Sequence, residues 1–71
     1  MLELSCRLVG PGGEVRRQAS LTTPCLRAIW RELAAIADHF GRPGDILQVF
    51  DRNGDMIIRM GVATARQALA A

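Results

Sequence analysis

The chain is predicted to be a small α+β domain in which two antiparallel hairpins form one four-stranded sheet and one long helix packs on a face of it. Two observations predict this class. In residues 2–21 and 46–60, apolar residues recur at every second position, which is the period of a strand with one buried face. Between these segments they recur at steps of three and four, which is the period of an amphipathic helix. The expected order is therefore ββαββ, followed by a short C-terminal helix.

The first hairpin is expected to join residues 2–9 to residues 14–21. The loop between them, Gly10-Pro11-Gly12-Gly13, contains residues that break a strand and permit unusual turn angles. Pairing the residues on either side of this loop puts the apolar positions of both strands on one face. Arg17 also falls on that face. A bulge or a frayed edge can accommodate it, or its side chain can extend along the apolar surface until the guanidinium reaches water. In this register the facing pairs are Val9–Glu14, Leu8–Val15, Cys6–Arg17, Leu4–Ala19 and Leu2–Leu21.

A helix is predicted from Pro24 to Phe40. Thr23 is expected to cap it with its hydroxyl oxygen, and Pro24 at the first helical position sacrifices no hydrogen bond. Gly41 is expected to end the helix, because glycine is common just after the last helical turn. The apolar stripe of this helix consists of Leu26, Ile29, Trp30, Leu33, Ile36, Ala37 and Phe40.

Asn53-Gly54 separates two apolar runs and predicts a second hairpin. A two-residue turn pairs Arg52 with Asp55, whereas a three-residue turn with a bulge at the glycine pairs Asp51 with Asp55. The first turn is favoured, because like charges that face each other cost up to ~1 kcal/mol. Apolar residues remain on the opposite face in either register, so this hairpin is expected to be covered on both faces. The expected strands are 46–51 and 56–60, with Leu47, Val49, Met56, Ile58 and Met60 on one face.

Residues 61–71 are rich in alanine, with Val62, Ala65 and Leu69 at helical spacing, so a short C-terminal helix is expected. The whole chain, residues 1–71, is predicted to form one domain. Because the long helix carries the chain back across the sheet, the second and third strands are expected to run in the same direction. No signal peptide is evident, and no apolar run approaches the ~18 residues of a membrane span. We therefore expect a cytoplasmic protein with reduced thiols.

The residue types of this chain predict no catalytic, cofactor-binding or metal site. Cys6, Cys25 and the single histidine, His39, are widely spaced, whereas a structural zinc site needs about four clustered ligands. Cys25 falls in the expected first turn of the helix, where the helix dipole lowers the pKa of a thiol. A thiol-dependent enzyme centred on Cys25 is therefore the weakest functional alternative, since no base stands beside it in the sequence.

The predicted function is that of a small non-enzymatic interaction or accessory protein that associates with itself as a homodimer or with another protein. A core of this size supplies only ~3–5 kcal/mol of stability, and 49% of the residues are hydrophobic, so a second subunit is the expected source of further stability. The candidate interface residues are Trp30, Phe50 and Ile57. Tryptophan at the edge of an apolar stripe is a common interface anchor.

The leading alternative is a nucleic-acid-associated regulator that uses arginine contacts. All nine basic residues are arginines, and the net charge is +2. Arg7, Arg16 and Arg17 cluster on the first hairpin and are the candidate phosphate contacts. The aromatic residues are few and lie in apolar patterns, so no platform for stacking bases is expected. A membrane partner is not expected either.

The segment Val49-Phe50-Asp51-Arg52-Asn53-Gly54, followed by an apolar strand and an alanine-rich tail, resembles a family of short uncharacterised proteins of alphaproteobacteria. That family combines a hairpin-helix-hairpin plan with a D-x-x-G turn. Gly10-Pro11-Gly12-Gly13 departs from its pattern, because the family has a more acidic loop there. The resemblance implies a bacterial protein with the same plan. It implies no activity and no site residue, because the family has no assigned activity.

Overall fold

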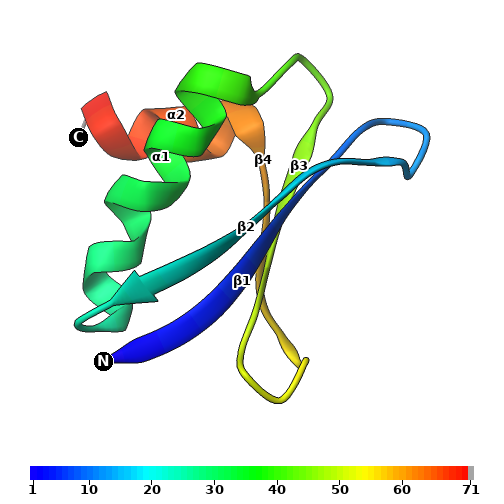
Figure 1. The fold of residues 1–71 in the computed structure, drawn as a ribbon. Helices are drawn as coiled ribbons and strands as arrows, with labels where there is room; N and C mark the ends of the chain where they lie inside the picture. The colour runs from blue at the N-terminus through cyan, green and yellow to red at the C-terminus, as the bar shows by residue number, and fades with distance from the viewer. Residues whose placement is uncertain (71) are drawn as a thin grey trace.

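The computed structural model describes residues 1–70, and side chains as far as Gln67. It has four strands in one sheet, a helix and a short C-terminal helix in the order ββαββα, which confirms the predicted α+β class (Figure 1). The last residue of the predicted C-terminal helix lies outside the described residues. The elements are β1 (Leu2–Val9), β2 (Val15–Thr23), a 3-10 helix (Leu26–Ala28), α1 (Ile29–Phe40), β3 (Ile46–Phe50), β4 (Met56–Gly61) and α2 (Val62–Ala70).

The strand order in the sheet is β2-β1-β3-β4, and every pair of neighbours is antiparallel. β2 and β3 therefore run in the same direction on either side of β1, as the crossover by the helix predicts. Each hairpin contributes one central strand and one edge strand. The two central strands meet around the facing pair Arg7 and Gln48.

Both helices cover the same face of the sheet (Figure 1). On α1, Ile29, Leu33 and Ala37 recur every fourth residue and are fully buried against the sheet and α2. The chain by itself does not cover both faces of the second hairpin as expected: the second face has no helix on it, and Phe50 there is only half-buried. The core consists of Leu4, Cys6, Leu8, Leu21, Ile29, Leu33, Ala37, Leu47, Val49, Val62 and Ala65.

The first hairpin pairs in a register displaced by two residues from the predicted one, with Leu4 opposite Leu21 instead of Ala19. The loop is one residue shorter than expected, because the amide of Gly10 donates to the carbonyl of Glu14 at 2.8 Å. Gly13 closes the turn with a φ of +89°, a conformation that favours glycine. A bulge then makes Arg16 the extra residue of β2 and keeps Arg17 on the buried face, opposite Leu8 instead of Cys6. The predicted pairs Val9–Glu14, Leu8–Val15 and Leu2–Leu21 are replaced by Val9–Val15, Leu8–Arg17 and Leu2–Thr23.

The second hairpin has the three-residue turn, so the favoured two-residue turn is wrong. The amide of Asp51 donates to the carbonyl of Asp55 at 2.9 Å, and Gly54 has a φ of +87°. Repulsion between the two carboxylates is offset because Asp51 Oδ1 accepts hydrogen bonds from the amides of Asn53 and Asp55. A bulge at Ile57 then restores the predicted pairs Leu47–Met60 and Val49–Ile58, while Met56 moves to the face of Phe50.

The helical segment begins later than predicted. Thr23 is the last residue of β2, where it faces Leu2, and its buried hydroxyl donates to the carbonyl of Cys25 at 2.9 Å. It therefore caps no helix: the 3-10 helix begins after Cys25, and neither helical start has a side-chain cap. Gly41 follows the last residue of α1 as predicted. No helix within residues 1–70 is long and apolar enough to cross a membrane.

Candidate functional site

The three predicted interface residues lie on two different surfaces. Trp30 belongs to α1 in the helical layer and is 42% exposed, so it is less buried than its place in the apolar stripe predicts. Phe50 alternates with the buried Val49 along β3 and therefore points to the face of the sheet without helices. Ile57, the bulged residue of β4, is exposed beside the strand position opposite Phe50.

The face without helices, which we name the uncovered sheet face, carries apolar residues in two of its cross-strand rows. A sheet face that remains in water usually carries polar side chains. Here Val15 is 52% exposed and Met56 is 47% exposed. A polar row separates these two rows. In one of them Val9 is itself buried, and in the other two serines precede the apolar pair. From the strand pairing, the rows are Val15, Val9, Ile46 and Gly61; then Gln18, Arg7, Gln48 and Arg59; then Ser20, Ser5, Phe50 and Met56.

The predicted phosphate contacts are also divided between two places. Arg7 lies on the uncovered sheet face, where its guanidinium carbon is 4.8 Å from the centroid of the Phe50 ring. Arg16 and Arg17 lie together, at the other face, beside the end of α1. Arg7 and the other two arginines therefore do not share one surface.

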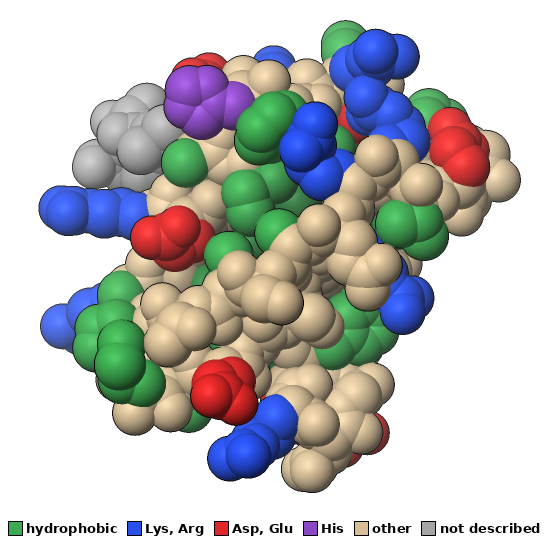
Figure 2. All heavy atoms as spheres, in the orientation of Figure 1, with side chains coloured by type: hydrophobic (Ala, Val, Ile, Leu, Met, Phe, Trp, Pro, Cys, Tyr) green, Lys and Arg blue, Asp and Glu red, His purple; other side chains and the backbone are tan. Residues whose placement is uncertain are grey.

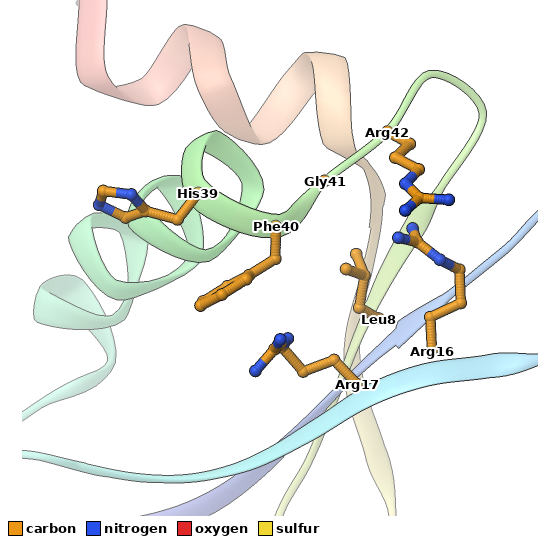
Figure 3. A pocket seen from close by; sticks show the side chains of 7 residues that line it. All are labelled: Leu8, Arg16, Arg17, His39, Phe40, Gly41 and Arg42. Atoms are coloured by element: carbon orange, nitrogen blue, oxygen red, sulfur yellow. The ribbon is translucent and has the colours of Figure 1, made fainter.

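Arg16 and Arg17 line a hollow of about 340 Å³ between β2 and the C-terminal end of α1 (Figure 3). We name it the basic hollow. The guanidinium carbon of Arg17 lies 3.7 Å from the centroid of the Phe40 ring. Figure 3 shows the side chains of Arg16 and Arg42 pointing toward each other. The complete lining is Leu8, Arg16, Arg17, His39, Phe40, Gly41 and Arg42.

One carboxylate stands against the three arginines of the basic hollow. Asp45, which is only 2% exposed, forms an ion pair with Arg16 and accepts a hydrogen bond from the backbone amide of Arg42 at 2.9 Å. This is the only ion pair among the side chains that the structure describes. The positive charge of the hollow therefore exceeds its negative charge.

The C-terminal end of α1 is covered by a side chain from α2. Arg66 donates hydrogen bonds from Nε and Nη2 to the carbonyl of Ala37, at 3.3 and 3.2 Å, and from Nη2 to the carbonyl of Gly41, at 3.0 Å. The amide of Gly41 also donates to the carbonyl of Ala37. These bonds satisfy carbonyls that would otherwise carry the negative end of the helix dipole.

An apolar hollow of about 100 Å³ adjoins the basic hollow and shares Leu8, Arg17 and Phe40 with it. Its floor includes Cys6, Ala19 and Ile36. Figure 2 shows apolar side chains on this side of the molecule, close to the purple histidine and to blue arginine side chains. A basic region and an apolar region therefore lie side by side.

A wider hollow of about 520 Å³ lies beside the turn of the second hairpin. Its charged lining residues are Glu3, Asp51 and Arg52. Because these side chains carry both signs of charge, this hollow selects no class of charged ligand.

The two cysteines have different environments and are both free thiols. Cys6 is in the core, and burial raises the pKa of its thiol from 9.0 to about 11. Cys25 is exposed and precedes the 3-10 helix, so it is not in the first turn of α1 as the sequence predicts. Among the described residues, no cluster of histidine, cysteine and acidic side chains has the arrangement of a metal site.

A scan against protein-family models found no match to this chain, and searches of curated proteins and of solved structures found none either. The resemblance to short alphaproteobacterial proteins therefore stays a prediction.

His39 and Arg42 are the members of the basic hollow that sequence reasoning missed. They flank the end of α1, and the crossover to β3 brings that end beside β2. The available signal was Arg17, a charged residue at a buried-face position of its strand. Such a residue has to find a partner at the edge of the helical layer, which here is Phe40.

Proposed function

We propose that the protein is a small non-enzymatic interaction module that associates with a second copy of itself through the uncovered sheet face. The observation that carries this proposal is the presence of the exposed Val15 and Met56 and the half-buried Phe50 on a face that neither helix covers. Removing such side chains from water stabilises an assembly by about 25 cal/mol per Å² of apolar surface.

The pattern of this face fits a partner of the same kind. The rows that contain Val15 and Phe50 lie on either side of the polar row that contains Arg7, Gln48 and Arg59. In a twofold dimer each subunit uses the same patch, so an axis along the polar row sets the Val15 row against the Phe50 row of the partner. The same axis sets the two arginines of the polar row against their own copies, so this dimer is expected to be stronger at high salt, where their repulsion is screened. Two sheets packed in this way lie about 10 Å apart.

The proposal is tested by sedimentation or light scattering over a range of micromolar concentrations. We expect a dimer for the unmodified chain and a monomer for Met56→Glu, which puts a charge in an apolar row. Trp30→Glu is the matched control, because Trp30 and Met56 are 42% and 47% exposed but lie on different layers. Circular dichroism checks that both variants are folded.

Two results contradict the proposal. One is an unmodified chain that stays monomeric at every concentration. The other is dissociation by Trp30→Glu but not by Met56→Glu, which assigns the interface to the helical layer.

The alternative of a nucleic-acid-associated regulator has less support, because Arg7 lies on the opposite face from Arg16 and Arg17. The alternative of a thiol-dependent enzyme also has less support. Cys25 precedes the helical segment, whereas His39 is near its end. A helix of 12 residues separates the two by about 18 Å along its axis, which is too far for a histidine to activate a thiol.

A further inference from the structure

We propose that the basic hollow and the adjoining apolar hollow form one binding site for a small phosphate ester whose second part is a compact apolar or aromatic group. This inference is independent of self-association, because the hollow lies on the opposite side of the sheet from the uncovered sheet face.

The charges of the basic hollow favour an anion. Asp45 neutralises one guanidinium, that of Arg16, and its carboxylate is already shared with the amide of Arg42. The guanidiniums of Arg17 and Arg42 have no carboxylate partner among the described side chains. Guanidinium groups donate paired hydrogen bonds that match the oxygens of a phosphate, and they do so from fixed planes.

The position of Arg17 is held in advance of binding. The bulge at Arg16 turns Arg17 to the helical side of the sheet, and the ring of Phe40 supports its guanidinium at 3.7 Å. A preorganised donor loses less conformational entropy when a ligand binds.

The end of a helix at which carbonyls are free repels an anion, and α1 ends at this hollow. Here the repulsion is reduced, because Arg66 donates to the carbonyls of Ala37 and Gly41. Arg66 therefore weakens the repulsion between an anion in the basic hollow and the end of α1.

The apolar hollow defines the second part of the ligand. Its volume of about 100 Å³ accommodates a small ring, and Ile36, Ala19 and Leu8 offer apolar walls. Arg17 and Phe40 line both hollows, so a ligand joined across them contacts both. A phosphate alone fills only the basic part.

The test titrates the protein with phenyl phosphate, inorganic phosphate or benzyl alcohol at low ionic strength. Binding is measured from the changes in amide chemical shifts. We expect phenyl phosphate to bind more tightly than either of the other two and to shift the amides of Gly41 and Arg42. Arg17→Gln and Arg42→Gln are each expected to weaken the binding of phenyl phosphate about tenfold. Ala19→Leu, which fills the apolar hollow, is expected to weaken the binding of phenyl phosphate but not the binding of inorganic phosphate.

Arg7→Gln is the matched control, because it also removes one charge and one contact between an arginine and an aromatic ring. It is expected to leave binding unchanged within about twofold. The proposal is overturned if Arg7→Gln weakens binding as much as Arg17→Gln. It is also overturned if phenyl phosphate causes no shifts at about 10 mM, or if a single-stranded oligonucleotide binds and phenyl phosphate does not. The last result assigns the arginines to an extended polyanion.

Discussion

Arg16 and Asp45, which are 29 residues apart in the chain, form an ion pair that joins the edge strand β2 to the start of β3. The two strands are not neighbours, since β1 lies between them. The carbonyl of Asp45 also accepts a hydrogen bond from the amide of Val62 at 3.0 Å. One buried residue therefore ties the first hairpin to the second hairpin and to the beginning of α2.

Arg16→Gln is expected to lower the free energy of unfolding by about 3 kcal/mol, because it leaves the carboxylate of Asp45 buried without its cation. A domain of this size has only ~3–5 kcal/mol of stability, so the variant is expected to keep no more than about 2 kcal/mol. Arg16→Lys keeps the charge and is expected to lose less. Urea denaturation measures the free energy of unfolding of the unmodified chain and of both variants. Arg52→Gln, in an exposed turn, is the control and is expected to change stability by no more than about 0.5 kcal/mol. Equal losses in Arg16→Gln and Arg52→Gln would show that the ion pair does not stabilise the fold.

Arg66→Met is expected to destabilise the protein by about 1–2 kcal/mol, because three donated hydrogen bonds to the end of α1 are lost while the length of the side chain is kept. Amide hydrogen exchange should accelerate most at the end of α1, where the carbonyl of Gly41 loses the side-chain donor and the carbonyl of Ala37 keeps only the amide of Gly41. Arg52→Met serves as the control, since Arg52 is an exposed arginine in the turn of the second hairpin, away from both helices. Unchanged exchange in α1 would refute the capping role of Arg66.

The spacing of apolar residues was enough to predict the order of elements and the faces of β1 and β3, and Gly41 was enough to predict the end of α1. The spacing did not predict the face of Met56 in β4. Turn geometry was not predictable in the same way. In both hairpins a three-residue turn closed by glycine shifts the facing pairs by one residue from the predicted register. The bulge at Arg16 shifts the first hairpin by one more, whereas the bulge at Ile57 shifts the second hairpin back to the predicted pairs. The bulge restores the matching of apolar faces, so the apolar pattern cannot distinguish this arrangement from a loop without a bulge.

The candidate site was predictable only in part, for the same reason. Arg17 could be placed on the buried face from its position in the strand, but its partner Phe40 depends on where α1 ends relative to β2. Arg7 and Arg16 lie on different faces of the sheet because of the bulge at Arg16, and no local sequence pattern predicts that bulge. Phe50 and Ile57 could be assigned to the outer face of the second hairpin. That Trp30 lies on a different surface could not be predicted until the positions of the helices relative to the sheet were known.

Gly41→Ala is expected to destabilise the protein by about 1–3 kcal/mol. A Cβ atom at this position would lie 2.5 Å from the carbonyl oxygen of Ala37 and 2.5 Å from Cγ1 of Val62, so α1 and α2 would have to move apart. Gly61→Ala is the matched control, because a Cβ atom there meets no atom within 4 Å. The control is expected to be neutral or to stabilise the protein by up to ~1 kcal/mol, through a less flexible unfolded chain. Thermal melting compares the two, and equal melting temperatures would contradict the close packing of the helix ends.

The stability of the protein is expected to fall as the pH rises from 9 toward 11. The pKa of the Cys6 thiol is raised from 9.0 to about 11 by burial, so in this range the unfolded chain has lost a proton that the folded chain still holds. Unfolding is therefore favoured by increasing pH. The readout is simple, because the chain contains no lysine and no tyrosine that titrates in the same range. Cys6→Ala should flatten the pH dependence of the unfolding midpoint in urea. A slope that survives in Cys6→Ala would assign the effect to another group.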